Sequence, residues 1–315
     1  MKRYLIIFLL FMSVILTISG CGKTYEFQLS PVDDSLTYAS NNQILYTSFD
    51  DNIVEPNRTN VFGANIISNT YNNGIGVITF DGDVTTIGED AFEDCSSLTS
   101  VNIPDSVTTI GRYAFASCHS LTSVKIGDSV TTIGRSAFSS CHSLTSVTIG
   151  DSVTTIGNHA FYKCSSLTSV NIPDNVTTIG DQAFCDCDSL TSVTIGDSVT
   201  TIGEYAFCDC DSLTSVTIGD SVTTIGDGAF CDCTSLTSVT IGDSVTTIGE
   251  YAFYRCNSLT SVYCKATTPP ALCNTYVFDT NGSGRKIYVP AESVEVYKRA
   301  TRWNEYASAI VGYDF

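Results

Sequence analysis

Residues 193–215 read VTIGDSVTTIGEYAFCDCDSLTS, and this 23-residue pattern recurs without insertion from Ile78 to Ser261. The repeated span has 184 residues, which is eight units of 23. Apolar and polar residues alternate over Val193–Ile195, the two-residue period of a strand. One unit is too small to bury its own apolar residues, so the repeat predicts a solenoid in which stacked coils bury one another.

The rest of each unit carries two further signals. Val199 and Ile202 predict a second short extended segment that ends before Gly203. The apolar residues of Ala206–Leu213 then recur at steps of three, which predicts a short helical turn. One phenylalanine of this turn is present in every unit, and each is expected to lie over the next. The column is Phe92, Phe115, Phe138, Phe161, Phe184, Phe207, Phe230 and Phe253.

These motifs resemble a known family. The pattern Leu-x-x-Val-x-Ile-x-x-Ser, which begins at Leu190, resembles the strand segment of leucine-rich repeats. The string Val-x-x-Ile-Gly-x-x-Ala-Phe-x-x-Cys-x-Ser-Leu, which begins at Val199, resembles the BspA-like subfamily of bacterial surface proteins. The resemblance covers residues 78–261 and implies a mainly β leucine-rich-repeat solenoid of eight 23-residue coils. It also implies adhesion to host or bacterial proteins, without enzymatic activity.

Composition excludes several functions. The chain has 315 residues, 33 acids and 15 bases, for a net charge of −18, so nucleic-acid binding is not expected. It has only three histidines, and no phosphate-binding loop, dinucleotide fingerprint or zinc-protease motif is present. Identical coils supply no unique set of catalytic groups. We therefore expect no enzyme, no catalytic residue, no cofactor and no metal site.

The two ends differ from the repeats. Residues 1–21 have a basic start, an apolar run and the sequence Ile-Ser-Gly-Cys, which resembles a bacterial lipobox with Cys21 as the lipidated residue. An ordinary cleaved signal peptide is the alternative. Residues 22–77 are expected to form a tether and an N-terminal β cap. Residues 262–315 are expected to form a C-terminal strand–helix cap, with a strand from Lys286 and a helix near Pro290.

The 14 cysteines fall into separate groups. Eight share one repeat position between Phe and Leu, and we expect them to be small buried core residues. Cys185, Cys208 and Cys231 form Cys-x-Cys in three consecutive coils, where drift at a surface position, a disulfide and a soft-metal site are the alternatives. No histidine accompanies them. Cys264 and Cys273 flank a double proline, and a disulfide between them is the candidate in the C-terminal cap.

The outward positions of the predicted strands are the candidate binding surface. They are rich in serine and threonine, and residues 170–238 carry 11 acids and no bases. The candidate ligand-facing residues are Lys125, Thr148, Asn171, Thr194, Thr217 and Thr240. We expect a monomer that binds an extracellular or cell-surface protein and contacts the outer membrane only through its lipid, on the cell surface or the periplasmic face. The alternative is a passive structural spacer or coat lipoprotein.

Overall fold

The computed structural model describes residues 16–20, 23–27 and 40–315 of the chain. The chain divides into two units, residues 1–38 and 39–315. In the first unit, β1 (Leu16–Gly20) and β2 (Lys23–Phe27) pair antiparallel, with Gly20 opposite Lys23. Cys21 and most of the expected tether lie outside the described residues.

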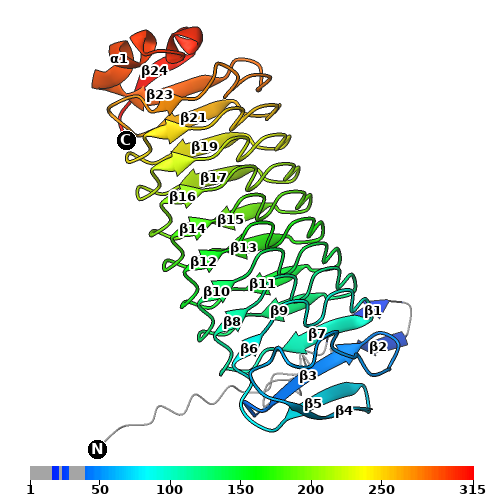
Figure 1. Cartoon of the computed structure of the whole chain (residues 1–315). Helices are drawn as coiled ribbons and strands as arrows, with labels where there is room; N and C mark the ends of the chain where they lie inside the picture. The colour runs from blue at the N-terminus through cyan, green and yellow to red at the C-terminus, as the bar shows by residue number, and fades with distance from the viewer. Residues whose placement is uncertain (1–15, 21–22, 28–39) are drawn as a thin grey trace, which may run out of the picture. The chain divides into compact units, whose positions relative to one another are not determined.

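The second unit is the predicted solenoid, in which each coil gives one strand to each of two parallel ladders (Figure 1). Identical residues lie opposite one another, as when Thr201 pairs with Thr224 and Ser215 with Ser238. One ladder is a nine-stranded sheet of two-residue strands. These are β6 (Thr86–Ile87), β8 (Thr109–Ile110), β10 (Thr132–Ile133), β12 (Thr155–Ile156), β14 (Thr178–Ile179), β16 (Thr201–Ile202), β18 (Thr224–Ile225), β20 (Thr247–Ile248) and β22 (Ala271–Leu272).

The other ladder is interrupted, although the sequence repeats through the interruption. Strands β15 and β17 belong to different sheets of eight and five strands, so the pairing stops between Thr194 and Ser215. The repeat strands of the eight-stranded sheet are β7 (Leu98–Asn102), β9 (Ser123–Lys125), β11 (Ser146–Thr148), β13 (Ser169–Asn171) and β15 (Ser192–Thr194). Those of the five-stranded sheet are β17 (Ser215–Ile218), β19 (Ser238–Ile241), β21 (Ser261–Cys264), β23 (Lys286–Pro290) and β24 (Ile310–Tyr313).

The expected phenylalanine column fills the interior. Phe184 is fully buried, and its ring lies 5.1 Å from that of Phe161 and 5.2 Å from that of Phe207, nearly parallel to both. The column continues past the repeats, because Phe253 stacks on Phe278 at 5.4 Å. The phenylalanine is the largest fully buried side chain of each repeat coil, so its burial contributes strongly to the stability of the stack.

Seven of the eight cysteines at the repeat position, Cys118 to Cys256, are buried core residues as expected, whereas Cys95 in the first coil is half-buried. The Cys210 Sγ also donates a hydrogen bond to the Phe184 carbonyl of the preceding coil at 3.3 Å, and the same bond recurs from Cys118 to Cys256. Burial raises the pKa of the Cys141 thiol to about 12, so this group remains neutral. The thiol therefore packs as a small apolar group and also satisfies a buried carbonyl.

The expected helical turn does not form. Residues 204–209 are a run of turns in which Tyr205 and Asp209 have positive φ angles of 54° and 57°. Alternate amides donate to the next coil, as Tyr205 N does to Asp227 O (2.8 Å) and Phe207 N to Ala229 O (2.8 Å). The three-residue spacing marks one buried face, as predicted. The amides of Ala206 and Cys208 still bond three residues back within the turn, but hydrogen bonds between coils replace every second bond that would close a helix.

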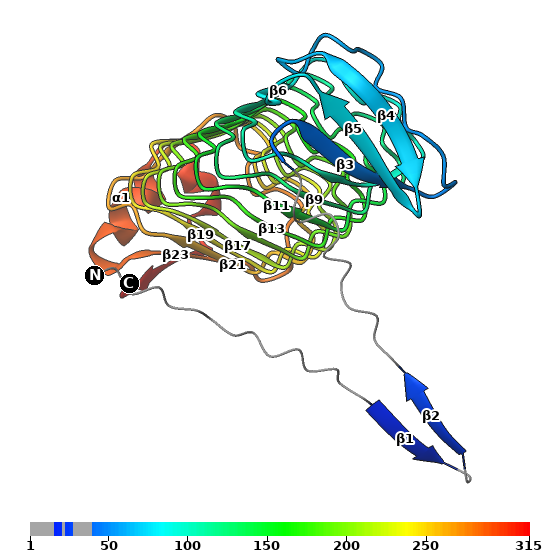
Figure 2. The same ribbon diagram turned by 90° about the horizontal axis from the view of Figure 1, so that it is seen from below.

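The N-terminal cap is an antiparallel hairpin with an added strand. Strand β5 (Ile75–Phe80) pairs antiparallel with β4 (Ile66–Asn72) and β3 (Gln43–Ser48), and β3 in turn pairs antiparallel with β7. Figure 2 shows these three strands across the N-terminal end of the stack. The first repeat, expected to begin at Ile78, therefore gives its first strand to the cap, because β3 lies where that strand would pair.

The C-terminal cap extends the parallel ladders before it closes them. Strands β23 and β24 continue the sheet of β21, with Tyr263 opposite Tyr288. The helices of residues 40–315 all lie here: η2 (Ala291–Ser293), α1 (Val294–Arg299) and η3 (Trp303–Tyr306). Tyr297 and Trp303 are buried. None of the helices in the described residues is long and apolar enough to cross a membrane.

Candidate functional site

All six candidate ligand-facing residues lie on one surface of the solenoid, which we call the polar sheet face. It consists of the outward side chains of β7, β9, β11, β13, β15, β17 and β19. Register places Lys125 beside Thr148, Asn171 beside Thr194, and Thr217 beside Thr240. All are exposed except Thr240, which is half-buried. The column therefore crosses the sheet interruption, with Thr194 and Thr217 on its two sides.

Two kinds of threonine are distinguished by their hydrogen bonds. Thr145 and Thr191 lie before the strands, and each hydroxyl donates to the carbonyl of the equivalent threonine one coil earlier at 3.0 Å. In the described part of the chain, the hydroxyls of Thr148, Thr194 and Thr217 make no such bond to another residue. Their hydrogen-bonding capacity is thus available to a partner. The sequence alone does not separate these two columns, because both recur in nearly every coil.

Aromatic residues continue the same column beyond the candidates. Tyr263 follows Thr240 in register, and its ring stacks on that of Tyr288 at 4.7 Å. Tyr313 meets both rings edge-on at 5.4 and 5.6 Å and is 43% exposed. Sequence reasoning missed this group because it ended the repeat at Ser261. The signal that could have found it is the spacing of Tyr263, which lies 23 residues after Thr240.

The cysteine column, defined as Cys185, Cys208 and Cys231, lies on the turn edge of the stack. Cys208 and Cys231 form a disulfide, with Cα atoms 4.7 Å apart. The Cys185 thiol is free and donates to Asp186 Oδ2 at 3.7 Å. Burial, together with the nearby Asp186 and Asp209 carboxylates, raises its pKa to about 12. Of the three alternatives for these residues, the structure therefore contains a disulfide between two adjacent coils.

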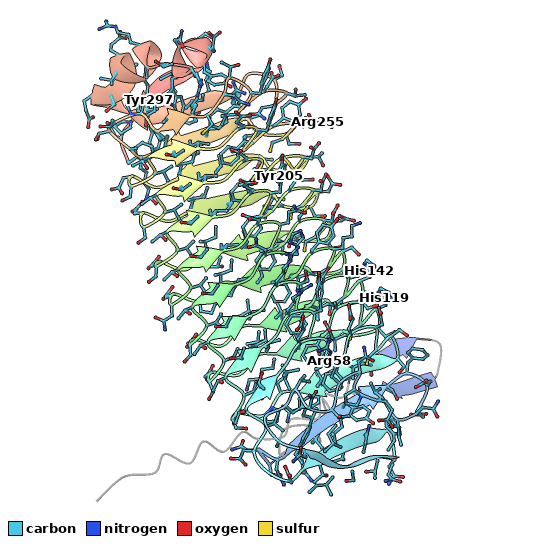
Figure 3. The ribbon with its side chains drawn as sticks, viewed as in Figure 1. Arg58, His119, His142, Tyr205, Arg255 and Tyr297 are labelled. Carbon is cyan, nitrogen blue, oxygen red and sulfur yellow. A yellow bond between two sulfur atoms is a disulfide. The ribbon has the colours of Figure 1, made fainter. Side chains whose placement is uncertain are left out.

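Carboxylates surround this column. Partial burial and the like charges of Asp232, Asp186 and Asp211 raise the pKa of Asp209 to about 6. Asp232 is paired with Arg255 at 3.2 Å. Figure 3 shows Arg255 and Tyr205 on the same edge of the stack as His119 and His142. The edge is thus acidic around Asp209, which has no ion pair of its own in residues 40–315, whereas Arg255 partly offsets the charge of Asp232.

The two stacked histidines do not form a chelating pair. Their rings are 5.0 Å apart and nearly parallel. His119 Nδ1 lies 2.9 Å from the Ser140 carbonyl oxygen, and His142 Nδ1 lies 3.0 Å from that of Lys163. The ring nitrogens of parallel imidazoles point in the same direction, so their lone pairs do not converge on one ion.

The predicted disulfide between Cys264 and Cys273 is wrong. Both thiols are free. Cys264 ends β21 in the five-stranded sheet, where its Sγ is buried 3.1 Å from the Tyr297 hydroxyl. Cys273 follows β22 in the nine-stranded sheet. The double proline does not fold the segment back on itself, because the coil continues across it and carries the two cysteines to different sheets.

Comparison with known proteins agrees with this architecture. A crystal structure of a leucine-rich repeat protein from Bacteroides ovatus is 29% identical, with a TM-score of 0.52 over 74% of this chain and 64% of that one. A T. pallidum leucine-rich repeat protein is 33% identical over 51% of this chain and 78% of that one, with a TM-score of 0.49. No curated protein matches.

The present chain therefore spans less than two thirds of the B. ovatus protein. The family model for the BspA type leucine-rich repeat region matches residues 64–191 and 177–302, which together cover the end of the N-terminal cap, the coils and most of the C-terminal cap. Solenoids of this family are typically non-enzymatic. The chain belongs to the BspA-type leucine-rich repeat family.

Proposed function

We propose that this chain is a non-enzymatic binding protein that docks a protein partner across several coils of the polar sheet face. The observation that carries the proposal is the exposed column of unpaired hydroxyls at Thr148, Thr194 and Thr217. Parallel strands repeat these groups about every 4.8 Å. Each contact is weak alone, but a partner that spans several coils makes many of them at once.

Charge supports a basic partner. Residues 170–238 carry 11 acids and no bases, whereas residues 101–169 carry three acids and four bases. The later coils therefore attract a cationic surface over a longer range than the earlier coils. We expect the affinity to fall as salt rises, because ions screen exposed charges.

We further propose that the protein is displayed at the outer membrane through a lipid on Cys21. The support is the sequence of residues 1–21, with its apolar run and terminal Ile-Ser-Gly-Cys. Cys21→Ser should abolish labelling with a fatty acid and release the protein from membrane fractions. Fatty-acid labelling that persists in this variant would show that the lipid is attached to another residue.

The binding test uses unanchored protein, residues 22–315, against immobilised extracellular-matrix proteins. Thr194→Lys with Thr217→Lys should weaken binding by bulk and by adding positive charge that repels a basic partner. Ser198→Lys with Ser221→Lys is the matched control, because it adds the same charge to exposed turns of the same two coils. Equal loss in both pairs would show that charge alone matters. If neither pair of substitutions weakens binding, the polar sheet face is excluded as the binding surface. If no matrix protein binds at any salt concentration, the passive spacer is favoured instead.

A further inference from the structure

The cysteine column brings thiol and carboxylate ligands within reach of one ion. The Sγ atoms of Cys185 and Cys208 and a carboxylate oxygen of Asp209 lie within 4.8 Å of one another. The same holds for Cys208, Cys231 and Asp232. We propose that, when the cysteines are reduced, Cys185, Cys208 and Asp209 bind one thiophilic divalent metal ion of the zinc class.

Coil stacking supplies what the local spacing lacks. Cys-x-Cys is not a zinc motif, and the sequence alone therefore predicts no metal. The converging ligands, however, come from two adjacent coils, where Cys185 and Cys208 occupy the same repeat position. Zinc–sulfur and zinc–oxygen bonds of about 2.3 and 2.1 Å place ligand atoms about 3.5–3.8 Å apart. Cys208 Sγ already lies 3.2 Å from Asp209 Oδ2, and no pair of these ligand atoms is more than 4.8 Å apart. Shifts of about 1 Å or less therefore reach this range, and rotation of side chains at the turn edge can provide them.

Charge selects between the two possible ligand sets. Asp232 already pairs with Arg255 at 3.2 Å. Asp209 has no ion pair with a basic side chain in residues 40–315, and the carboxylates of Asp186, Asp211 and Asp232 lie around it. A cation beside Asp209 relieves this repulsion, whereas a cation beside Asp232 would compete with Arg255. The ion therefore belongs with Cys185, Cys208 and Asp209, and water completes a fourth position.

The disulfide and the metal exclude each other, because both use Cys208. A dithiol reductant breaks the Cys208–Cys231 bond by giving it two electrons and two protons, while its own two sulfurs join as a disulfide. Cys208 and Cys231 are then thiols. Metal binding releases one proton from each of Cys185 and Cys208, which become thiolate ligands. The column thus holds either a disulfide or a metal ion.

Cadmium titration tests the site. The unanchored protein is reduced with dithiothreitol, freed of it by gel filtration under argon, and titrated with Cd²⁺ while thiolate-to-cadmium absorption is recorded in the ultraviolet. We expect one high-affinity ion per reduced chain and none per disulfide-bonded chain. Cys185→Ser and Asp209→Asn should each weaken binding at least tenfold. Cys231→Ser should retain it after reduction, and Cys273→Ser is the matched control for a thiol outside the column.

Protection from alkylation provides a second readout that needs no variant. Zn²⁺ should slow the modification of Cys185 and Cys208 in the reduced wild-type chain, as mapped by mass spectrometry, and leave that of Cys273 unchanged. No tight binding by the reduced chain, or undiminished binding after Cys185→Ser, would overturn the proposal. Loss of binding in Cys231→Ser with retention in Asp209→Asn would assign the ion to the other ligand set. Circular dichroism of each variant separates loss of a ligand from loss of the fold.

Discussion

At the scale of single residues, the stacked phenylalanines are among the largest fully buried side chains of the solenoid. Phe184 is fully buried between two parallel rings. Phe184→Ala should therefore lower the free energy of unfolding by about 3–5 kcal/mol, through lost apolar burial and the cavity left behind. Urea unfolding followed by circular dichroism measures the change, and Phe184→Leu should cost less because it fills part of the cavity. A loss below about 1 kcal/mol would mean that the ring is not packed as described.

Asp209 shows how stacking changes the chemistry of an ordinary surface residue. Its pKa is about 6 in the folded chain, against an ordinary 3.8. Between about pH 4 and pH 6, the folded chain therefore holds a proton at Asp209 that the unfolded chain has lost. This proton stabilises the fold fully below about pH 4, and the benefit disappears as pH rises through about 6. Asp209→Asn should therefore raise the melting temperature near pH 7.5 and leave it almost unchanged near pH 4. Melts of the disulfide-bonded protein in chelator measure both values, and an equal shift at the two pH values would contradict the assignment.

At the scale of the coil, the cysteine column can close its disulfide in more than one place. The Sγ atoms of Cys185 and Cys208 already lie within 4.8 Å of each other. Cys231→Ser should therefore move the bond to Cys185–Cys208 when the protein is oxidised in air, because the same backbone geometry repeats one coil earlier. Peptide mapping without reduction identifies the pair. Finding both Cys185 and Cys208 as free thiols would show that only the later pair of coils can form the bond.

The elements inside each coil could be predicted from the sequence to different degrees. The strands at Val193 and Ile202 and the buried face of Ala206–Leu213 follow from apolar spacing, which records burial directly. The positive φ angle of Tyr205 does not, because tyrosine rarely adopts this conformation. Hydrogen bonds to the next coil hold it there. Local spacing reports which side chains are buried, but it does not report which backbone amides find partners in another coil.

The candidate site was predictable to a similar extent. Alternation along each strand identified Thr194 and Thr217 as outward residues, and the structure places both on one exposed face. The choice of Cys208–Cys231 over Cys185–Cys208 was not predictable, since the three cysteines sit in almost identical sequences. The prediction of a Cys264–Cys273 disulfide failed for a different reason. Only eight residues lie between these two cysteines in the chain, but the coil between them places them in different sheets.

At the scale of the whole solenoid, residues 39–315, stability is divided among interfaces between neighbouring coils. One of these interfaces differs from the others. Sheet pairing stops between β15 and β17 while β16 and β18 remain paired, and the Thr214 amide is 3.5 Å from the Thr191 carbonyl oxygen. The equivalent bond from Thr191 to Thr168 is 2.9 Å. The coils on either side have nearly the same sequence, so the interruption is a property of the assembled stack.

Separation of the stack should therefore begin at this interface. Gly226 lies in it, and an added Cβ would be 2.6 Å from the carbonyl carbon of Gly203 and 2.7 Å from the backbone nitrogen of Glu204 in the preceding coil. Gly226→Ala should push the two coils apart and leave two blocks, residues 40–213 and 214–315, each with one cap. Gly219→Ala is the matched control, since a Cβ there meets nothing within 4 Å. Because coils are coupled only through neighbours, calorimetry should show two transitions for Gly226→Ala and one for Gly219→Ala. Hydrogen exchange should accelerate first at the Thr214 amide, whose bond to the Thr191 carbonyl oxygen crosses the interface. A single transition at the wild-type temperature would mean that the neighbouring coils accommodate the added methyl group. In that case the interface at the interrupted sheet would not be the weakest in the solenoid.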